Sequence, residues 1–226
     1  MTMTLFTTKE MSWINSFDPN KRVFKNGAYY FLKRSMDLTL VLLSMPLWAP
    51  LLLVIGVLIT VTSPGAPAWF TQLRTGKGGK RFRMYKFRSM VPNAEELKKT
   101  YMHLNELQWP DFKITNDPRV TKVGKFLRKT SLDELPQLIN VLKGEMSLVG
   151  PRPTSFGSET YKLWHTERLD VLPGLTGLWQ IVGRAQLEFD DRLRLDITYI
   201  ERASIWLDIN ILVRTIFAVF KQKGAH

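Results

Sequence analysis

An apolar stretch near the N-terminus constrains the fold more than any other feature of this chain. No charged residue occurs between Leu38 and Leu73, and the roughly 24 residues up to Val61 exceed the roughly 20 that a helix needs to span a bilayer. Pro46 and Pro50 lie near the middle, and each removes a backbone donor and clashes with the preceding helical turn. We therefore expect the helix to break into two arms of about 12 residues, each about 18 Å long, which is little more than half of the hydrocarbon layer.

Basic residues lie on both sides of this apolar segment, and cytoplasmic flanks of membrane segments collect such residues. They are Lys21, Arg22, Lys25, Lys33 and Arg34 before it, and Arg74, Lys77, Lys80, Arg81, Arg83, Lys86 and Arg88 after it. A full span would put one cluster on the wrong side of the membrane, so the pattern favours a re-entrant hairpin; a span and a buried helix are the alternatives. A cleaved signal peptide is excluded, because about 30 mostly polar residues come first and no cleavage site follows.

Composition limits the partners and the chemistry. The 226 residues suit one functional unit, and 32 Lys and Arg against 20 Asp and Glu give a net charge of +12. Such a charge suits nucleic acid, an acidic lipid surface or a phosphorylated substrate. The absence of cysteine excludes disulfides and thiolate metal sites and fits a reducing compartment, and the three histidines are too far apart in sequence to indicate a zinc site.

The rest of the chain has the pattern of a small α+β domain that is mainly α-helical. Short aromatic and alternating runs at residues 68–72 and 81–90 flank a glycine-rich turn at residues 76–79, which predicts a β-hairpin; the turn lacks the spacing of a P-loop. Residues 111–119 are loop-like. Helices are expected at residues 93–106, 120–128, 155–169 and 205–220. The last helix suits either the membrane interface or the core of the domain.

An adjacent acidic pair, Asp133-Glu134, precedes an arginine, Arg152, that two prolines hold rigidly. This layout is typical of a phosphate-handling site, but helix capping competes with it, because acidic residues favour the start of a helix. A capping box from Ser131 to Glu134 would place Pro136 at the fifth helical position, where its ring clashes. Asp133 as the cap would place Pro136 in the first turn, where it is tolerated.

The stretch from Ser131 to Pro153 resembles the catalytic core of the bacterial sugar transferases, also called monotopic phosphoglycosyl transferases. Shorter family-like motifs occur in the family's order at residues 33–37, 85–90, 117–119, 173–177 and 183–184. The resemblance runs from about Tyr30 to the C-terminus; the long match is specific, whereas each short motif alone is weak. In one departure, Ala49-Pro50 stands where the family usually has Ser-Pro, so a hydroxyl that could bond a freed carbonyl is missing there, and Pro46 and Ser44 are expected to compensate.

The resemblance implies a two-step transfer. Asp133 would attack the sugar-linked phosphorus of a UDP-sugar, expel UMP and hold the phosphosugar covalently, and a polyprenyl phosphate such as undecaprenyl phosphate would then accept it. The family uses Mg²⁺, and Asp133 and Glu134 are the predicted metal-site residues; Glu134 would act in catalysis at or near the metal, either as a ligand or as a general base. A cation is needed because like charges about 4 Å apart repel by about 4 kcal/mol at an effective dielectric constant near 20.

Three arginines are expected to bind substrate phosphates: Arg128 and Arg152 flank the acidic pair, and Arg184 follows later in the chain. Arg152 is the strongest of these predictions. Arg184 and Asp196 would line the sugar-nucleotide site, with an ordinary surface ion pair as the alternative for either. Lys33-Arg34 would bind lipid headgroups at the membrane entry, with a basic flank that only sets topology as the alternative.

The expected organisation has three parts: a polar leader at residues 1–29, a re-entrant membrane helix at residues 30–66, and a cytoplasmic catalytic domain with amphipathic interfacial helices at residues 67–226. The resemblance places the protein at the cytoplasmic face of a bacterial inner membrane, in contact with membrane lipids. The sequence identifies neither the sugar, nor the glycan pathway, nor the prenyl length, and a homodimer stays open.

Three other function classes compete. A non-enzymatic basic membrane anchor or assembly protein would tolerate the loss of Asp133. A nucleic-acid binder is disfavoured, because the basic residues follow the apolar segments and no nucleic-acid motif occurs. A glycosyltransferase that moves only the sugar would release UDP, whereas phosphosugar transfer releases UMP.

Overall fold

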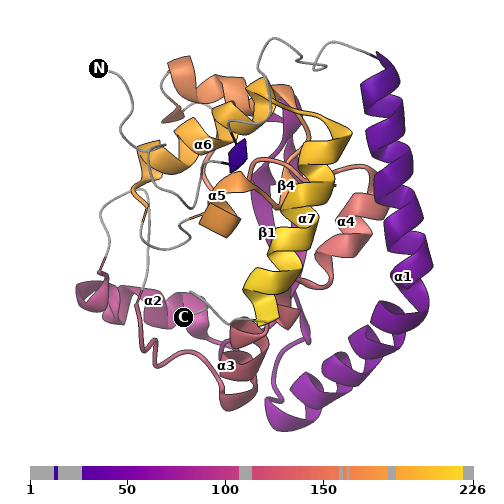
Figure 1. The fold of residues 1–226 in the computed structure, drawn as a ribbon. Coiled ribbons are helices and arrows are strands. Elements are labelled where there is room, and N and C mark those ends of the chain that lie inside the picture. Colours follow the sequence, from indigo (N-terminus) through magenta and orange to yellow (C-terminus); the bar gives the residue numbers. More distant parts are fainter. Residues whose placement is uncertain are drawn as a thin grey trace.

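The computed structural model describes residues 13–14, 27–106, 114–157, 160–161, 163–182 and 187–220. Within these ranges the protein is mainly α-helical, with two small two-stranded sheets (Figure 1). The helices are α1 (Gly27–Thr62), α2 (Ala94–Thr100), α3 (Lys122–Lys129), α4 (Gln137–Lys143), α5 (Leu178–Val182), α6 (Phe189–Glu201) and α7 (Ile205–Phe220). The strands are β1 (Trp69–Thr75), β2 (Arg81–Phe87), β3 (Ser147–Val149) and β4 (Gly174–Thr176).

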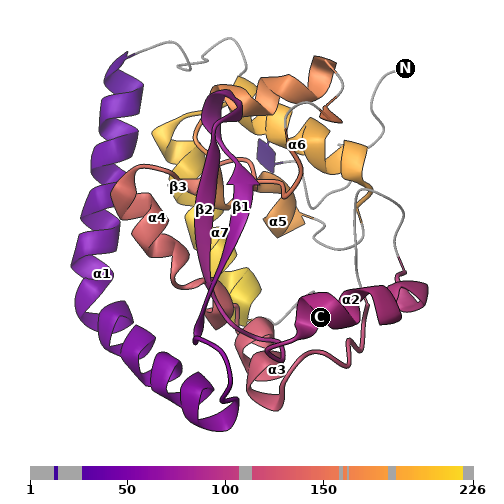
Figure 2. The ribbon, with the colours of Figure 1, turned by 180° about the vertical axis from the view of Figure 1, so that it is seen from behind.

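The predicted hairpin is confirmed. Strands β1 and β2 pair antiparallel, from Trp69 opposite Phe87 to Thr75 opposite Arg81, and a short 3₁₀ turn at Lys77–Gly79 joins them. In Figure 2 this hairpin lies across the face of the domain opposite α7. Helices α3 and α7 confirm two predicted helices, with α7 at the expected residues.

Two other helix predictions need correction. The helix expected at residues 93–106 ends at Thr100 and continues as a 3₁₀ turn at Met102–Leu104. The helix expected at residues 155–169 is instead a 3₁₀ helix at Leu163–Asp170, and the described residues 155–157 before it are not α-helical. The parallel pair β3–β4 was not predicted, because three-residue strands carry too little periodicity to be recognised.

Helix α1 runs without interruption over 36 residues, with Pro46 and Pro50 inside it. It bends about halfway along its length instead of breaking into two separate arms (Figures 1 and 2). Two side chains bond the carbonyl of Val41 in the turn before Pro46: the hydroxyl of Ser44 at 3.2 Å and the indole N–H of Trp48 at 2.9 Å. Ser44 thus bonds a backbone carbonyl near the bend, though not the carbonyl of Leu42 that Pro46 leaves without its helical donor.

Within the described ranges, α1 is the helix long and apolar enough to cross a membrane, with a mean hydropathy of 2.4 and 22% of its most apolar window buried. One such helix is weak evidence of membrane association. Large apolar side chains, among them Phe31, Leu43, Leu47, Leu53 and Val61, are more than 70% exposed. The helix therefore presents an apolar surface that the rest of the described chain leaves uncovered.

One stripe of α1 is buried, and it contains charged residues. The ammonium group of Lys33 lies 2.8 Å from the carboxylate of Asp208 on α7, which also accepts a 2.7 Å hydrogen bond from the Tyr199 hydroxyl on α6. Asp37 accepts a 2.7 Å hydrogen bond from the hydroxyl of Ser147 on β3. Buried ionic and polar contacts therefore fix α1 to α7 and β3.

These contacts correct the prediction for Lys33-Arg34. Lys33 is 9% exposed and paired with Asp208. Arg34 donates hydrogen bonds of 2.6 Å and 3.0 Å to the carbonyls of Val141 and Leu142, at the C-terminus of α4, where cations stabilise the last turn. Both side chains thus anchor α1 to the protein, which is a structural role and not the contact with lipid headgroups that we expected.

Replacing Asp208 by alanine should therefore lower the free energy of unfolding by about 3 kcal/mol, because Lys33 is left buried without its partner. Thermal or denaturant unfolding of the detergent-solubilised protein measures this loss. Asp170→Ala removes an exposed carboxylate and serves as the control. An unfolding midpoint for Asp208→Ala equal to that of the wild type would contradict a structural role for the pair.

Part of the leader also contacts the domain. Ile14 is 1% exposed, and its carbonyl accepts a 2.9 Å hydrogen bond from Arg202 at the end of α6. The guanidinium of Arg214 on α7 lies 4.1 Å from the centre of the Trp13 ring. Residues 13–14 therefore pack on the α6–α7 corner.

Two glycines allow the segment that carries Arg152 to lie close to β4. A Cβ on Gly174 would lie 2.1 Å from the backbone nitrogen of Gly150, so a larger residue would separate the two chains. The N–H of Gly174 donates to the carbonyl of Pro151 at 2.9 Å. This contact gives residues 173–177 a physical role, because it fixes the backbone immediately before Arg152.

Candidate active site

The acidic pair lies in a 3₁₀ turn, Leu132–Glu134, between α3 and α4. Helix α4 begins only at Gln137, with Pro136 at the position before it, and no side chain caps either element. The capping alternative for Asp133 and Glu134 is therefore wrong. Ser131 enters the turn with a φ of 59°, a left-handed conformation that costs a serine about 1 kcal/mol or more and that clusters at functional sites.

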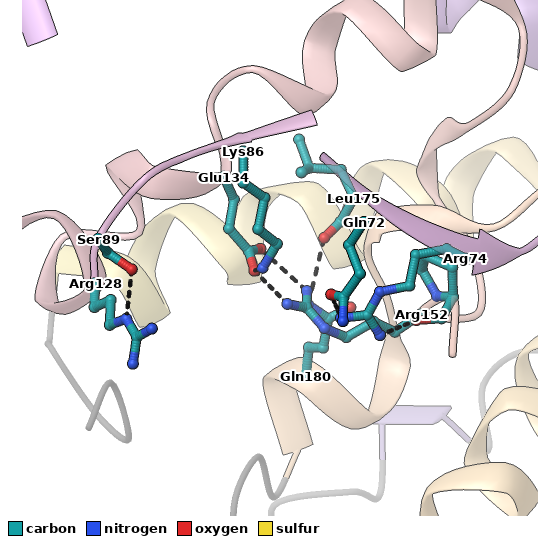
Figure 3. A network of polar contacts seen from close by, with 10 residues as sticks. Gln72, Arg74, Lys86, Ser89, Arg128, Glu134, Arg152, Leu175 and Gln180 are labelled. Atoms are coloured by element: carbon teal, nitrogen blue, oxygen red, sulfur yellow. Dashed lines mark hydrogen bonds and ion pairs between the residues drawn. The ribbon is translucent and has the colours of Figure 1, made fainter. Parts of the chain in front are cut away.

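Glu134 is held by two cations from different elements (Figure 3). The ammonium group of Lys86 on β2 lies 2.8 Å from Oε1, and the guanidinium of Arg152 bonds both carboxylate oxygens, one of them at 3.0 Å. Burial would raise the pKa of Glu134, but Arg152 and Lys86 hold it well below its ordinary value. Glu134 is therefore ionised and already paired.

Asp133 differs from its neighbour. Within the described part of the chain no hydrogen bond or ion pair engages its carboxylate, which lines the main cavity. Burial raises the pKa of Asp133, and the charge of Glu134 adds to this effect, while Lys86, Arg128 and Arg152 oppose it. The two carboxylates are thus separated in role by their surroundings: one is fixed by cations, and the other is available to react.

Two further arginines stand beside the pair. Arg128, in the last turn of α3, donates a 2.8 Å hydrogen bond from Nε to the hydroxyl of Ser89. Arg74 on β1 donates to the carbonyl of Pro153 at 3.1 Å and to the amide of Gln72 at 2.6 Å, which places it next to Arg152 (Figure 3). Burial and the neighbouring charge of Arg152 together lower the pKa of Arg74 to about 10, so the group remains a cation at neutral pH.

Sequence reasoning brought Arg128 and Arg152 to this site correctly but missed Lys86 and Arg74. Lys86 had been assigned to the basic flank of the membrane segment and to the family-like motif at residues 85–90, and Arg74 to the basic flank alone. The available signal was the alternation of the hairpin strands, which puts side chains two apart on one face, although Arg74 lies two residues beyond the predicted strand at residues 68–72. Arg184 lies outside the described residues.

Asp196 is not in the position that we predicted for it. It is 1% exposed, does not line the main cavity and lies 2.7 Å from the guanidinium of Arg168, so it is neither a sugar-nucleotide contact nor part of a surface ion pair. Burial raises the pKa of Asp196 to about 7, while Arg168 and Arg192 oppose this shift. Arg168 also bonds the carbonyl of Arg152, so the buried pair supports the backbone of the phosphate-binding segment.

The cavity in front of Asp133 has a volume of about 1830 Å³, larger than the 300 to 1,000 Å³ typical of a site for one small ligand. Its charged part contains Asp133 and the four cations just described. Its apolar part is lined by α1 and α7, through side chains that include Leu40, Val41, Leu212, Val213 and Ile216. The cavity therefore joins a cationic centre to a hydrocarbon-like surface.

The two carboxylates could bind magnesium only together with further ligands from outside the protein. No three His, Asp or Glu side chains of the described residues gather in one place, so protein ligands alone form no metal cage there. Mg²⁺ is commonly held by one or two carboxylates together with substrate phosphates and water. Asp133 and Glu134 would supply these two carboxylates if a diphosphate were bound beside them.

Comparison with known proteins then assigns the family. The model of the family described as "Bacterial sugar transferase" matches residues 28–222. The chain belongs to the bacterial sugar transferase family. It is 44% identical over 209 residues to the galactosyl transferase CpsE of Streptococcus agalactiae serotype III, covering 89% of this chain and 45% of that protein.

Two more relatives are similar to this chain over most of its length. An undecaprenyl-phosphate galactose phosphotransferase of Salmonella typhimurium is 44% identical over 201 residues, covering 87% of this chain and 42% of that protein. The exopolysaccharide production protein ExoY of Rhizobium meliloti is 39% identical over 199 residues, covering 86% of this chain and 88% of that protein. The chain thus spans less than half the length of CpsE and of the Salmonella relative, but 88% of ExoY.

Proposed function

We propose that this sugar transferase moves a sugar-1-phosphate from a UDP-sugar to a polyprenyl phosphate, through a covalent phosphosugar on Asp133. The observation that carries this proposal is the carboxylate of Asp133, which has no partner among the described residues and faces a cavity that joins a group of cations to an apolar surface. A cation-lined centre suits a diphosphate, and the apolar part suits a lipid acceptor. The name of the Salmonella relative, an undecaprenyl-phosphate galactose phosphotransferase, supports the same reaction class.

In the first step a carboxylate oxygen of Asp133 attacks the phosphorus that bears the sugar. The bond from this phosphorus to the bridging oxygen breaks, and UMP leaves with the electron pair. Arg152, Lys86 and Arg74 are placed to bind the phosphate oxygens as negative charge shifts to the leaving group. Glu134 fixes Arg152 and Lys86, so their orientation is set before the substrate arrives.

In the second step an oxygen of the polyprenyl phosphate attacks the same phosphorus. The bond to Asp133 breaks, the carboxylate is regenerated, and the product is a polyprenyl diphosphate sugar. Dividing the transfer in this way lets two anionic substrates use one site in turn, which limits the charge repulsion that both would cause together. Mg²⁺, held by Asp133 and Glu134 with the diphosphate, would neutralise part of the phosphate charge.

The proposal places the enzyme at the cytoplasmic face of a bacterial inner membrane, with the exposed apolar surface of α1 in contact with lipid. Helix α7 adds to this surface, because Trp206, Ile216 and Phe217 are more than half exposed. Leu207 and Ile211, on the other side of α7, are buried in the domain. The helix thus meets both descriptions left open by the sequence, with one side in the core and the other suited to an interface.

The rate of the first step should fall at acidic pH. Because burial raises the pKa of Asp133 above its ordinary value of 3.8, the nucleophile takes up a proton at a higher pH than a free aspartate would. Glu134 stays ionised over the same range, since its pKa is held low. Single-turnover UMP release measured from about pH 4 to about pH 8 should decline toward low pH by about tenfold per unit below the midpoint.

Circular dichroism at each pH controls for unfolding. A rate that stays constant down to the ordinary pKa of aspartate would contradict the assignment of Asp133 as a buried nucleophile.

The reaction class is tested by identifying the released nucleotide. Protein in nanodiscs is incubated with undecaprenyl phosphate, Mg²⁺ and each of several UDP-sugars. Release of UMP with one of them supports phosphosugar transfer and identifies the sugar. Release of UDP would indicate ordinary glycosyl transfer, and no nucleotide from any sugar with folded protein would favour a membrane anchor or assembly role.

A further inference from the structure

Arg88 is a buried cation without a counter-ion. Three arginines of the described residues are at least nine-tenths buried, and two of them face an aspartate: Arg119 pairs with Asp117 at 2.6 Å, and Arg168 pairs with an aspartate at 2.7 Å. Arg88 is 9% exposed, and no carboxylate of the described residues pairs with it. One of its nitrogens, Nη2, donates to the carbonyl of Ser63, while Nε and Nη1 have no partner there.

This arrangement is unfavourable unless an anion completes it. A buried guanidinium without a paired charge carries a large desolvation penalty, and unpartnered donors add to it. Burial accordingly lowers the pKa of Arg88 below its ordinary value. A backbone carbonyl offers only a partial charge, so the contact with Ser63 holds the side chain without neutralising it. The charge therefore fits a ligand with negative oxygens.

The position of Arg88 indicates which ligand supplies these negative oxygens. The β1–β2 ladder continues one pair beyond β2, because the Arg88 N–H donates to the carbonyl of Ala68 at 2.8 Å. Arg88 thus lies on the same face as Lys86, about 7 Å further along the chain, and Lys86 contacts Glu134. In the other direction Ser63 directly follows α1, the apolar helix.

Arg88 therefore stands between the end of α1 and the catalytic carboxylates, and it lines the main cavity together with apolar neighbours such as Phe70 and Pro92. A ligand that reaches the active site from the side of this helix would bring its phosphate past Arg88. Arg74, in contrast, stands next to Arg152 and donates a hydrogen bond to the carbonyl of Pro153, the residue after Arg152.

We propose that Arg88 binds the phosphate of the polyprenyl acceptor, separately from the cations that bind the diphosphate of the sugar donor. This inference rests on the proposed function. It predicts that the two substrates are bound by different arginines. The loss of Arg88 should therefore weaken the binding of the polyprenyl acceptor and leave the binding of the sugar donor unchanged.

The test is steady-state kinetics with each substrate varied in turn. Arg88→Gln keeps a donor for the Ser63 carbonyl but removes the charge, and Arg88→Lys keeps the charge. Arg83→Gln removes an exposed cation from the same strand and serves as the matched control. For Arg88→Gln we expect the KM for undecaprenyl phosphate to rise by about tenfold or more, with the KM for the UDP-sugar unchanged within about twofold. Arg88→Lys should recover much of this loss.

Three outcomes would overturn the inference. An acceptor KM for Arg88→Gln equal to that of the wild type would show that the charge is not used. An equal rise in both KM values would indicate a general structural role. Weaker binding to phosphatidylglycerol vesicles, with the acceptor KM unchanged, would make Arg88 a headgroup contact. An inactive wild type would instead contradict the proposed function itself.

Discussion

Asp133→Asn is expected to abolish the release of UMP from a UDP-sugar, with a fall in rate of about 10⁴-fold or more. An amide oxygen is a poor nucleophile toward phosphorus and cannot form the covalent phosphosugar. Asparagine has nearly the same volume, and no hydrogen bond of the described residues is lost, because none engages the Asp133 carboxylate. The fold and the affinity for the donor should therefore survive, which separates the loss of chemistry from a loss of structure.

The matched control is Asp170→Asn, which makes the same change at an exposed carboxylate that does not line the cavity. It should leave the rate within about twofold of the wild type. Donor binding by Asp133→Asn, measured by calorimetry with UDP-sugar, shows whether the site remains formed. UMP release by Asp133→Asn at a rate near that of the wild type would exclude Asp133 as the nucleophile and would favour Glu134 or a bound water in that role.

Arg152→Gln is expected to lower kcat/KM for the UDP-sugar by about 10² to 10³-fold, the range found when one preorganised donor to a developing charge is removed. Two effects combine in this loss. The guanidinium no longer binds phosphate oxygens. In addition, Glu134 loses its bidentate contact with Arg152 and keeps only its contact with Lys86. Lysine at this position should restore little, because an ammonium group cannot reproduce the two parallel hydrogen bonds.

Arg83→Gln again provides the control for charge, and an unfolding midpoint for Arg152→Gln near that of the wild type would exclude global destabilisation. The assignment of Arg152 would be wrong if kcat/KM for the donor changed by less than about threefold while the protein remained folded.

The sequence predicted an element correctly where the pattern lay within a short stretch of neighbouring residues. Alternation predicted the β1–β2 hairpin, a run of apolar residues predicted α7, and the acidic pair with Arg152 predicted the centre of the site. Residues whose meaning depends on distant partners were misassigned. Lys33 precedes an apolar segment and so looks like a topogenic flank, but its partner Asp208 lies 175 positions away in the chain.

The same limit explains the missed members of the site. Lys86 meets Glu134 across 48 positions, and Arg74 meets the carbonyl of Pro153 across 79. Neither contact could be inferred without knowing how the hairpin packs on the turn that carries the acidic pair. The continuity of α1 was likewise hidden, because prolines predict a break, whereas the bonds from Ser44 and Trp48 to a nearby carbonyl depend on the conformation of the bent helix itself.

The central claim is that Asp133 carries the phosphosugar between the two substrates. The most direct test incubates the protein with Mg²⁺ and a UDP-sugar whose sugar-linked phosphate is radioactive, without lipid acceptor, and measures the label bound to protein after rapid acid quench. We predict stoichiometric label that maps to the peptide with Asp133, is absent from Asp133→Asn, and moves into lipid when undecaprenyl phosphate is added. Formation of labelled lipid in the complete reaction, with no label on the protein at any time before it, would contradict the covalent mechanism.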